Sequence, residues 1–432
     1  MNRRTFVKGS TLAISAPYIL PSHIWGAEIK PSNRLNVGVV GIGAHGHAVM
    51  RAFMYNKSRV VAICDVDPAC LTRGKQTLGE FNAGKAGAIP PKVYSDYREL
   101  IADPDVDIVV VTTPDHWHAL VTITALKAGK DVYCEKPLTH NIYEAVTVMK
   151  AVEANKRILQ TGSMQRSWPE FRTACELVRN GIIGKISKVE CSFGNAPKPY
   201  DLPAEPIKDV LNWDKWCGPA QVVPYNTKLH PEKWRLYREF GGGGVCDFGA
   251  HHYDIAQWGL GFDDEGPTEI LPPEKETDTT GCTLVYSNGI PVIHKLGFGI
   301  SFYGEDGLVQ VNRGNFEFTL NGKTEAKFVN GTQGTSCEAQ VAITAKRFLS
   351  DAKIKLPVSK HHVTNFLDCV ISRKQPIAHE RIGAHTAICC HLMNQSYYHR
   401  QKMLWDPQNY TFRNGTGHPS WLTRNYREEY KV

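Results

Sequence analysis

Asn36-Val37-Gly38-Val39-Val40-Gly41-Ile42-Gly43-Ala44-His45-Gly46 is the stretch that decides the fold of this chain. Its first half is an apolar run typical of a strand buried on both faces, and a helical pattern follows at once. The glycines have the spacing G-x-G-x-x-G, which allows a tight turn, a close backbone approach to a pyrophosphate and close helix packing. The stretch predicts a dinucleotide-binding turn whose contacts come from Gly41, Ile42, Gly43, Ala44, His45 and Gly46.

Strands and helices continue to alternate up to about residue 161. A helix is predicted over 44–55, and buried strands over 59–65, 107–112, 130–133 and 157–160. Near-continuous apolar strands separated by helices indicate a parallel sheet covered on both faces. We therefore predict a Rossmann dinucleotide-binding domain over 34–161.

Asp65 ends the second strand, 19 residues after Gly46. A carboxylate there can accept hydrogen bonds from an adenosine ribose and disfavours the extra phosphate of NADP, so NAD is the predicted cofactor. Thr113 and Pro114 follow another strand at the same edge. His118 either caps the next helix or lines the cofactor cleft. Because His116 and His118 have no other converging donors, no metal is predicted.

Cys134-Glu135-Lys136-Pro137 follows the strand at 130–133, and Pro137 prevents that strand from continuing. A lysine at the carboxyl end of a parallel strand faces the crevice where such sheets bind ligands. We predict that Lys136 lies beside a nicotinamide ring and that Glu135 and Gln165 also contact the cofactor. The alternative is a solvated lysine in a strand-to-helix loop.

A glycine run at 241–244 leads into Val245-Cys246-Asp247-Phe248-Gly249-Ala250-His251. A helix is predicted to begin near Cys246 or Asp247, which places Asp247 and His251 four residues apart on one face. A histidine can take the hydroxyl proton of an alcohol while hydride leaves for a nicotinamide. Asp247 would orient the hydroxyl or stabilise the charged histidine. The alternative is a buried, satisfied histidine with an aspartate cap.

The sequence pattern changes after residue 162, from buried strands separated by helices to alternating strands. An alternating strand over 186–193, a hairpin signal at 283–290 and a strand at 315–320 indicate a largely antiparallel sheet with helices on one face. The tail over 363–403 is predicted helical, with an interruption at Gln375-Pro376. The predicted fold class is α/β, with a C-terminal α/β domain over 162–432.

Composition and charge limit the other possibilities. The net charge of +7 over 432 residues and the lack of a basic run with interleaved aromatics argue against nucleic acid. No apolar run long enough to span a membrane follows the N-terminal segment. Asn2-Arg3-Arg4-Thr5-Phe6-Val7-Lys8 predicts a twin-arginine signal over 1–30 and a periplasmic or otherwise exported protein, with a cytosolic enzyme as the alternative. Most of the twelve cysteines are expected to be free thiols.

Together the glycine turn, the tetrapeptide at 134–137 and Asp247-x-x-x-His251 resemble the Gfo/Idh/MocA oxidoreductase family. Trp213-Asp214-x-Trp216-x-Gly218-Pro219 and Trp405-Asp406-Pro407 resemble its exported bacterial branch. The resemblance implies that Lys136, Asp247 and His251 are catalytic. It also implies a sugar or polyol substrate and a homo-oligomer formed through the open sheet of the second domain.

Aromatic faces suit a sugar ring, and cationic or imidazole groups suit its hydroxyls. On that basis the candidate substrate contacts are Arg166, Trp168, Tyr225, Trp234, Arg235 and His252. The leading hypothesis is an NAD-dependent oxidoreductase acting on a secondary hydroxyl of a sugar, polyol or glycoside. Because export separates the enzyme from free NAD, the cofactor is expected to be tightly bound. The alternatives are a redox-neutral glycoside hydrolase or lyase and a non-catalytic sugar sensor.

Overall fold

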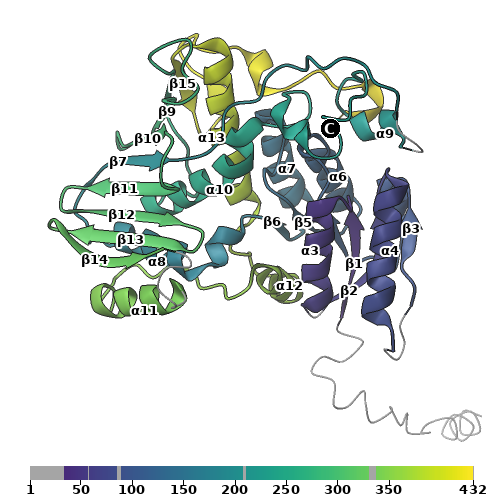
Figure 1. The fold of residues 1–432 in the computed structure, drawn as a ribbon, viewed down its shortest axis with the longest axis horizontal. Coiled ribbons are helices and arrows are strands. Elements are labelled where there is room, and N and C mark those ends of the chain that lie inside the picture. Colours follow the sequence, from purple (N-terminus) through teal and green to yellow (C-terminus); the bar gives the residue numbers. More distant parts are fainter. Residues whose placement is uncertain (1–33, 57, 85–88, 208–210, 330–336, 432) are drawn as a thin grey trace, which may run out of the picture.

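Six parallel strands form the first sheet of the computed structural model, in the order β3-β2-β1-β4-β5-β6 (Figure 1). The structure describes residues 34–56, 58–84, 89–207, 211–329 and 337–431, so the predicted signal over 1–30 lies outside the described residues. The order reverses between β1 and β4, which is the arrangement of a Rossmann domain. The strands are β1 (Leu35–Val40), β2 (Ser58–Cys64), β3 (Lys92–Tyr94), β4 (Ile108–Val111), β5 (Asp131–Cys134) and β6 (Leu159–Thr161).

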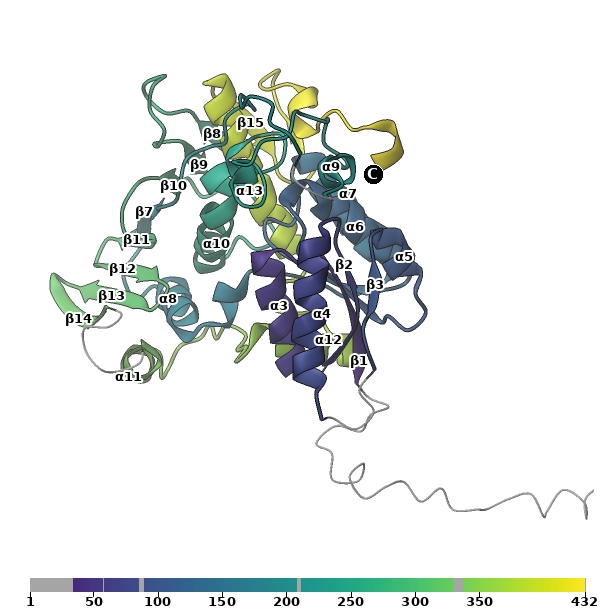
Figure 2. The same cartoon turned by 45° about the vertical axis from the view of Figure 1, so that its right-hand side comes forward.

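Helices cover both faces of this sheet, because its strands are apolar on both sides. One face packs on α3 (Ala44–Tyr55), α4 (Pro68–Asn82) and α12 (His362–Ser372). The opposite face packs on α5 (Tyr97–Ala102), α6 (Asp115–Lys127) and α7 (Ile142–Asn155). Figure 2 shows α3 and α4 side by side in front of the sheet.

Helix α12 packs on the first sheet, although it lies about two hundred residues after β6 in the chain. Its Phe366 makes an edge-on ring contact with Phe53 of α3, with ring centroids 6.2 Å apart. The predicted second domain, 162–432, includes this segment, so α12 belongs to that range by sequence position while its apolar face packs on the first sheet. Periodicity identifies an apolar helix face but does not say which sheet that face covers.

Ten strands form the second sheet in the described part of the chain, in the order β14-β13-β12-β11-β7-β10-β9-β8-β15-β16. The pair β7 and β10 is parallel and all other neighbours are antiparallel, which confirms the predicted largely antiparallel sheet. The strands are β7 (Ile186–Cys191), β8 (Glu269–Leu271), β9 (Thr283–Val285), β10 (Pro291–His294), β11 (Ile300–Gly304), β12 (Gly307–Asn312), β13 (Asn315–Leu320), β14 (Lys323–Phe328), β15 (Met403–Asp406) and β16 (Thr411–Phe412).

The helices of the second domain pack on one face of this sheet (Figure 1). They are α8 (Pro169–Arg179), α10 (Gly243–Leu260), α11 (Cys337–Phe348) and α13 (Glu380–His399), while the short α9 (Trp213–Cys217) lies in the long loop before α10. The gap between α12 and α13 contains the predicted interruption at Gln375-Pro376. No described helix is both long enough and apolar enough to cross a bilayer. All twelve cysteines lie in the described ranges and are free thiols.

Helix α10 begins at Gly243, earlier than the predicted start at Cys246 or Asp247. Gly243 has φ = 67°, a left-handed conformation that favours glycine. A side chain at Gly244 would meet the backbone of Gly194 at 2.4 Å. The glycine run is therefore a closely packed first turn of the helix, and it fixes the position of the residues that follow.

Candidate active site

A cavity of about 990 Å³ lies at the carboxyl ends of β1, β2, β4 and β5. Helix α10 and residues 230–236 of the second domain form its other walls. The cavity is at the switch point between β1 and β4, where doubly wound sheets bind their ligands. Both halves of the chain are therefore needed to form it.

The glycine turn at 41–46 forms one end of this cavity. Gly41 has φ = 90°, and a side chain there would lie 2.7 Å from the backbone nitrogen of Thr113. A side chain at Gly46 would lie 2.1 Å from the carbonyl oxygen of Gly41, so the start of α3 must pack directly on the turn. A side chain at Gly43 would meet nothing within 4 Å and would project into open space.

The first turn of α3 has free donors for an anion. Its N-cap, Gly43, makes no side-chain capping bond, and the turn contains no acidic residue. The first backbone N–H groups of a helix have no partner within the helix, and they attract phosphate. The open space at Gly43 and these donors fit the pyrophosphate of a dinucleotide.

The position of Asp65 also fits a bound dinucleotide, and its carboxylate stabilises the glycine turn at 41–46. Its carboxylate accepts hydrogen bonds from the backbone N–H groups of Ile42 at 2.6 Å and Asp67 at 2.9 Å. Burial raises the pKa of Asp65 to about 6 against the opposing effect of these bonds. Asp65 lines the cavity, whereas Ile42 is fully buried and its side chain does not.

Lys136 and Asp247 both line the cavity and form an ion pair. Lys136 Nζ donates to Asp247 Oδ1 at 2.5 Å and to the Asp247 carbonyl oxygen at 3.1 Å. Burial opposes ionisation of Asp247, but Lys136 and then Arg235 outweigh it and lower the pKa of that carboxyl. An ammonium has three N–H donors, so one remains for a ligand.

His251 lies one helical turn after Asp247 and lines the same cavity. Burial, followed by the charges of Lys136 and Arg313, holds its pKa well below the ordinary value. Its Nδ1 is buried and has no hydrogen-bond partner among the described residues. An uncharged imidazole beside a lysine is able to accept a proton from a bound hydroxyl.

The other predicted cofactor contacts lie at the same edge. Thr113, Pro114, His118 and Glu135 line the cavity, and the buried hydroxyl of Thr113 has no partner in the part of the chain that the structure describes. His118 does not cap α6; its ring nitrogens lie 2.7 Å from the carbonyl oxygen of Pro137 and 2.9 Å from that of Thr113. It therefore bridges the two loops that carry the site.

Glu135 and Gln165 both contact other residues of the cavity wall, although only Glu135 lines the cavity itself. The carboxylate of Glu135 lies 3.3 Å from His45 Nε2, and His45 lines the cavity. Gln165 is fully buried and does not line the cavity. With its amide oriented to satisfy both groups, Gln165 donates to the His251 carbonyl oxygen at 3.1 Å and accepts from Arg313 at 3.3 Å. It thus contacts two cavity residues and not the cavity itself.

Only two of the six predicted substrate contacts line the cavity, namely Trp234 and Arg235. The Arg235 guanidinium stacks 4.2 Å from the Trp234 ring and lies 3.7 Å from Asp247 Oδ1. This pair is part of the cavity wall that the second domain contributes.

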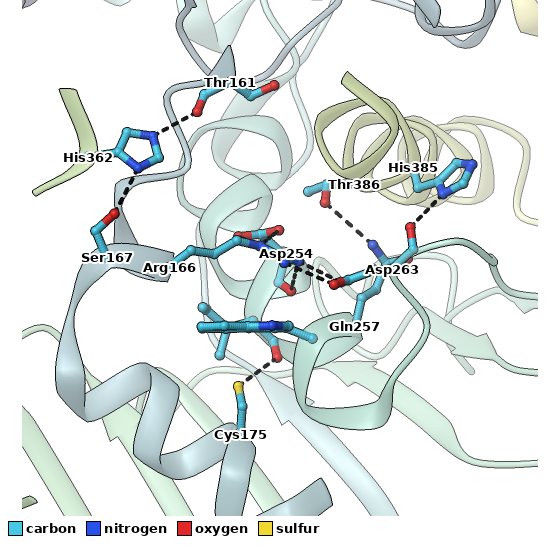
Figure 3. A network of polar contacts seen from close by, with 12 residues as sticks. Thr161, Arg166, Ser167, Cys175, Asp254, Gln257, Asp263, His362, His385 and Thr386 are labelled. Atoms are coloured by element: carbon cyan, nitrogen blue, oxygen red, sulfur yellow. Dashed lines mark hydrogen bonds and ion pairs between the residues drawn. The ribbon is translucent and has the colours of Figure 1, made fainter. Parts of the chain in front are cut away.

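Arg166 is not in the cavity, so its predicted substrate contact is corrected. Its Nε donates to both carboxylate oxygens of Asp254, at 2.8 and 3.0 Å, and Nη1 and Nη2 donate to Asp263 at 3.0 and 2.6 Å (Figure 3). Arg166 is 2% exposed and stacks on Trp258 at 5.0 Å. All three guanidinium nitrogens donate to protein acceptors, so Arg166 links its own segment to Asp254 of α10 and to Asp263 in the loop after α10.

The three remaining candidates are also placed elsewhere. Tyr225 packs edge-on against Trp213, 5.1 Å between centroids, in a separate aromatic cluster. Trp168 packs against Phe171, and His252 Nδ1 donates to the Ser192 carbonyl oxygen at 2.7 Å. Helical geometry explains the case of His252, because adjacent residues on a helix point about 100° apart and only His251 faces the cavity.

Asp115 and Arg313 line the cavity and were missed in the sequence. Asp115 accepts from the Gly242 N–H at 3.4 Å, and burial raises its pKa to about 7 despite Arg235 and Lys136. Asp115 lies in the stretch after β4 and was detectable as an acid at the ligand-binding edge. Arg313 lies in the turn between β12 and β13, far from any motif, so no local signal indicated it.

Comparisons with known proteins agree with this geometry. The family model described as an oxidoreductase family with an NAD-binding Rossmann fold matches residues 35–163, and the C-terminal alpha/beta domain of an oxidoreductase family matches 182–432. Inositol 2-dehydrogenase of Salmonella typhimurium (strain LT2) is 35% identical over 190 residues, which is 41% of this chain and 54% of that protein.

Two further proteins are similar to this chain, one in sequence and one in structure. Glycosyl hydrolase family 109 protein 2 of Shewanella sp. (strain ANA-3) is 25% identical over 247 residues, 53% of each chain. A solved levoglucosan dehydrogenase in complex with NADH and levoglucosan shares the fold at 18% identity, with a TM-score of 0.57 over 85% of this chain and 98% of that one.

The matched segments thus span about half the length of the inositol dehydrogenase and the glycosyl hydrolase. The two family models, in contrast, together extend over both domains of this chain. The N-terminal domain is an NAD-binding Rossmann domain, and the chain belongs to the Gfo/Idh/MocA oxidoreductase family.

Proposed function

We propose that the protein is an NAD-dependent dehydrogenase that oxidises a secondary hydroxyl of a sugar, polyol or glycoside. One observation carries the proposal: the Lys136–Asp247 pair and an uncharged His251 share a cavity with the glycine turn of α3. The similarity to inositol 2-dehydrogenase supports a polyol or sugar as the substrate class.

The reaction follows from the groups in the cavity. Bound NAD supplies the hydride acceptor. Asp247 holds Lys136 by two of its donors, and the third N–H of Lys136 donates to the oxygen of the reacting hydroxyl. His251 accepts the hydroxyl proton as the carbon loses hydride, so an alcohol becomes a ketone. In the reverse direction the imidazolium returns its proton to the oxygen.

A redox-neutral glycoside hydrolase remains the second candidate, because the chain is similar to a glycosyl hydrolase family 109 protein. Such an enzyme would oxidise a ring hydroxyl, eliminate the glycosidic substituent and take the hydride back. The motif Asp247-Phe248-Gly249-Ala250-His251 favours the dehydrogenase, because it places an acid and a base one helical turn apart in the cavity that holds Lys136.

One experiment separates these activities. The protein is purified without added cofactor, tested for bound NAD, and incubated with myo-inositol, free sugars and nitrophenyl glycosides. A lasting rise in absorbance at the NADH band, stoichiometric with bound cofactor, supports the dehydrogenase. Release of nitrophenol without net reduction would contradict it in favour of the hydrolase, and ligand-dependent stabilisation alone would indicate a sensor.

We also propose that the chain is exported through the twin-arginine pathway and assembles through the open face of its ten-stranded sheet. The motif Arg3-Arg4 within 1–30 supports export, and the placement of the helices on the opposite sheet face supports assembly. Fusion of residues 1–30 to a reporter, with Arg3→Lys/Arg4→Lys as control, tests export. Light scattering of the purified protein tests assembly.

A further inference from the structure

A second cavity, of about 240 Å³, lies on the other side of the glycine run that precedes α10. Gly243 and Gly244 line the active-site cavity, whereas Gly241 and Gly242 line the second one. Its remaining walls come from the segment before α7, from α13 and from residues 420–424 near the C-terminus. The proposed function assigns this cavity no role.

Several residues that line this cavity have buried polar atoms without a partner in the described structure. Arg424 Nη2 donates to the carbonyl oxygen of His116 at 2.7 Å and pairs with Glu144 at 3.0 Å. Its Nε and Nη1 are buried without a hydrogen bond, as are His140 Nδ1 and Asn394 Oδ1. Buried polar atoms are costly without partners, so the cavity is built for a polar occupant.

The charge of the lining favours an anion. Arg424 and Arg238 both line the cavity, together with His140, His391 and His399, and no aspartate or glutamate does so among the described residues. Glu144 engages only one nitrogen of Arg424 and lies outside the lining. Guanidinium groups with free N–H donors bind carboxylate and phosphate oxygens strongly.

We propose that this second cavity is a binding site for a small oxyanion, a phosphate or a carboxylate, held by Arg424 and Arg238. The anion would accept hydrogen bonds from the unpaired donors of Arg424, and Asn394 lines the same cavity without donating to the anion. Asn394 Nδ2 donates to the Gly242 carbonyl oxygen at 3.0 Å. A bound anion therefore stabilises the residues that contact the glycine run. The run leads directly into the part of α10 that places Asp247 in the active site.

The test measures anion binding to the full chain with NAD present at saturation, so that the glycine turn of α3 is occupied. Isothermal titration calorimetry and thermal unfolding are recorded with inorganic phosphate and with acetate, against sodium chloride of equal ionic strength. We expect phosphate or acetate to raise the melting temperature above the chloride control. Tighter binding of one probe identifies the oxyanion as tetrahedral or planar.

Arg238→Gln is expected to weaken this binding about tenfold or more, because it removes one charge-assisted contact. Arg381→Gln is the matched control, since Arg381 lies on the surface beside Asp264 and does not line the cavity. Arg424→Gln should abolish binding, but it also removes the bond to His116. Arg238→Gln therefore decides the result if the Arg424 variant does not fold.

Three outcomes would overturn the proposal. The first is the lack of any anion-specific effect in the wild-type protein. The second is equal affinity in the wild type and in Arg238→Gln. A signal seen only without NAD would also overturn it, because the anion would then occupy the cofactor turn of α3.

Discussion

Helix α10 carries two acid–base pairs that differ in their surroundings. At its start, Asp247 pairs with Lys136, and the two side chains are 33% and 13% exposed. Two turns later, Asp254 pairs with Arg166, and these side chains are 0% and 1% exposed. Arg166 uses all its nitrogens within the protein (Figure 3), whereas Lys136 keeps one donor for a ligand.

The difference shows that the residue types alone do not determine what such a pair does. A cation with no free donor and no exposure can only join elements of the fold. A cation with a spare donor, beside a cavity and an uncharged base, can act on a substrate. Four predictions test this contrast.

The largest effect is expected at the buried pair. Arg166→Met leaves Asp254 and Asp263 without their partner, and the free energy of unfolding should fall by about 3–5 kcal/mol. Urea unfolding followed by tryptophan fluorescence measures the change. Adding Asp254→Asn should restore part of the loss, because the stranded charge is then removed. An unchanged midpoint would show that the pair does not stabilise the fold.

Substitution in the Lys136–Asp247 pair should have the opposite result, with a large loss of turnover and a small change in stability. Lys136→Met should lower kcat by about 10²–10³-fold through loss of a donor to the reacting oxygen. The free energy of unfolding should change by less than about 1 kcal/mol, since the side chain borders a cavity. Both are measured on protein that still binds NAD by calorimetry. Turnover within tenfold of the wild type would refute the assigned role.

Asp115 sharpens the comparison because it is nearly as buried as Asp254 but lines the cavity. Burial raises its pKa to about 7 from the ordinary 3.8. The native state then binds the proton more tightly than the unfolded state, so this group lowers stability as pH rises from about 4 to 7. Asp115→Asn should remove that loss, on the order of 2 kcal/mol at pH 8 after relaxation of the site.

The measurement for Asp115 is the difference in unfolding free energy between variant and wild type at pH 5 and pH 8. The difference should favour the variant more at pH 8. Equal differences at the two pH values would show that Asp115 does not titrate in this range.

The smallest effect is expected at Arg313. Burial, Lys136 and Arg313 all lower the pKa of His251, so the acidic limb of kcat/KM for alcohol oxidation should lie below pH 6.5. Arg313→Gln removes one positive charge and should move that limb upward, by roughly one pH unit at most. A pH profile of both proteins tests this. A downward shift would mean that the limb belongs to another group.

Much of the first domain was predictable from local patterns. The glycine turn and the helix over 44–55 are set by neighbours in the chain, and the structure has the helix at Ala44–Tyr55. The start of α10 was predicted three to four residues too late, because the glycine run looks flexible in sequence. Tertiary contact with Gly194 makes it the first turn of the helix.

The substrate side of the site was less predictable. Arg166, Trp168, Tyr225 and His252 have residue types that suit a sugar, but packing directs them elsewhere. Arg313 shares no local motif with the site and reaches it only because β12 and β13 place their turn beside α10. Spatial proximity between distant segments has no period or spacing in the sequence.

The sequence by itself determined the Rossmann domain, the NAD-binding turn and the spacing that places Asp247 and His251 on one helix face. These follow from backbone geometry over a few residues, where a glycine or a four-residue step has a direct steric meaning. Only the tertiary structure decided that Lys136 meets Asp247, that Arg166 is locked between two aspartates and that α12 covers the first sheet. Those contacts join residues about 90 to 310 positions apart, and burial, which local sequence does not encode, decides which charged group stays free to react.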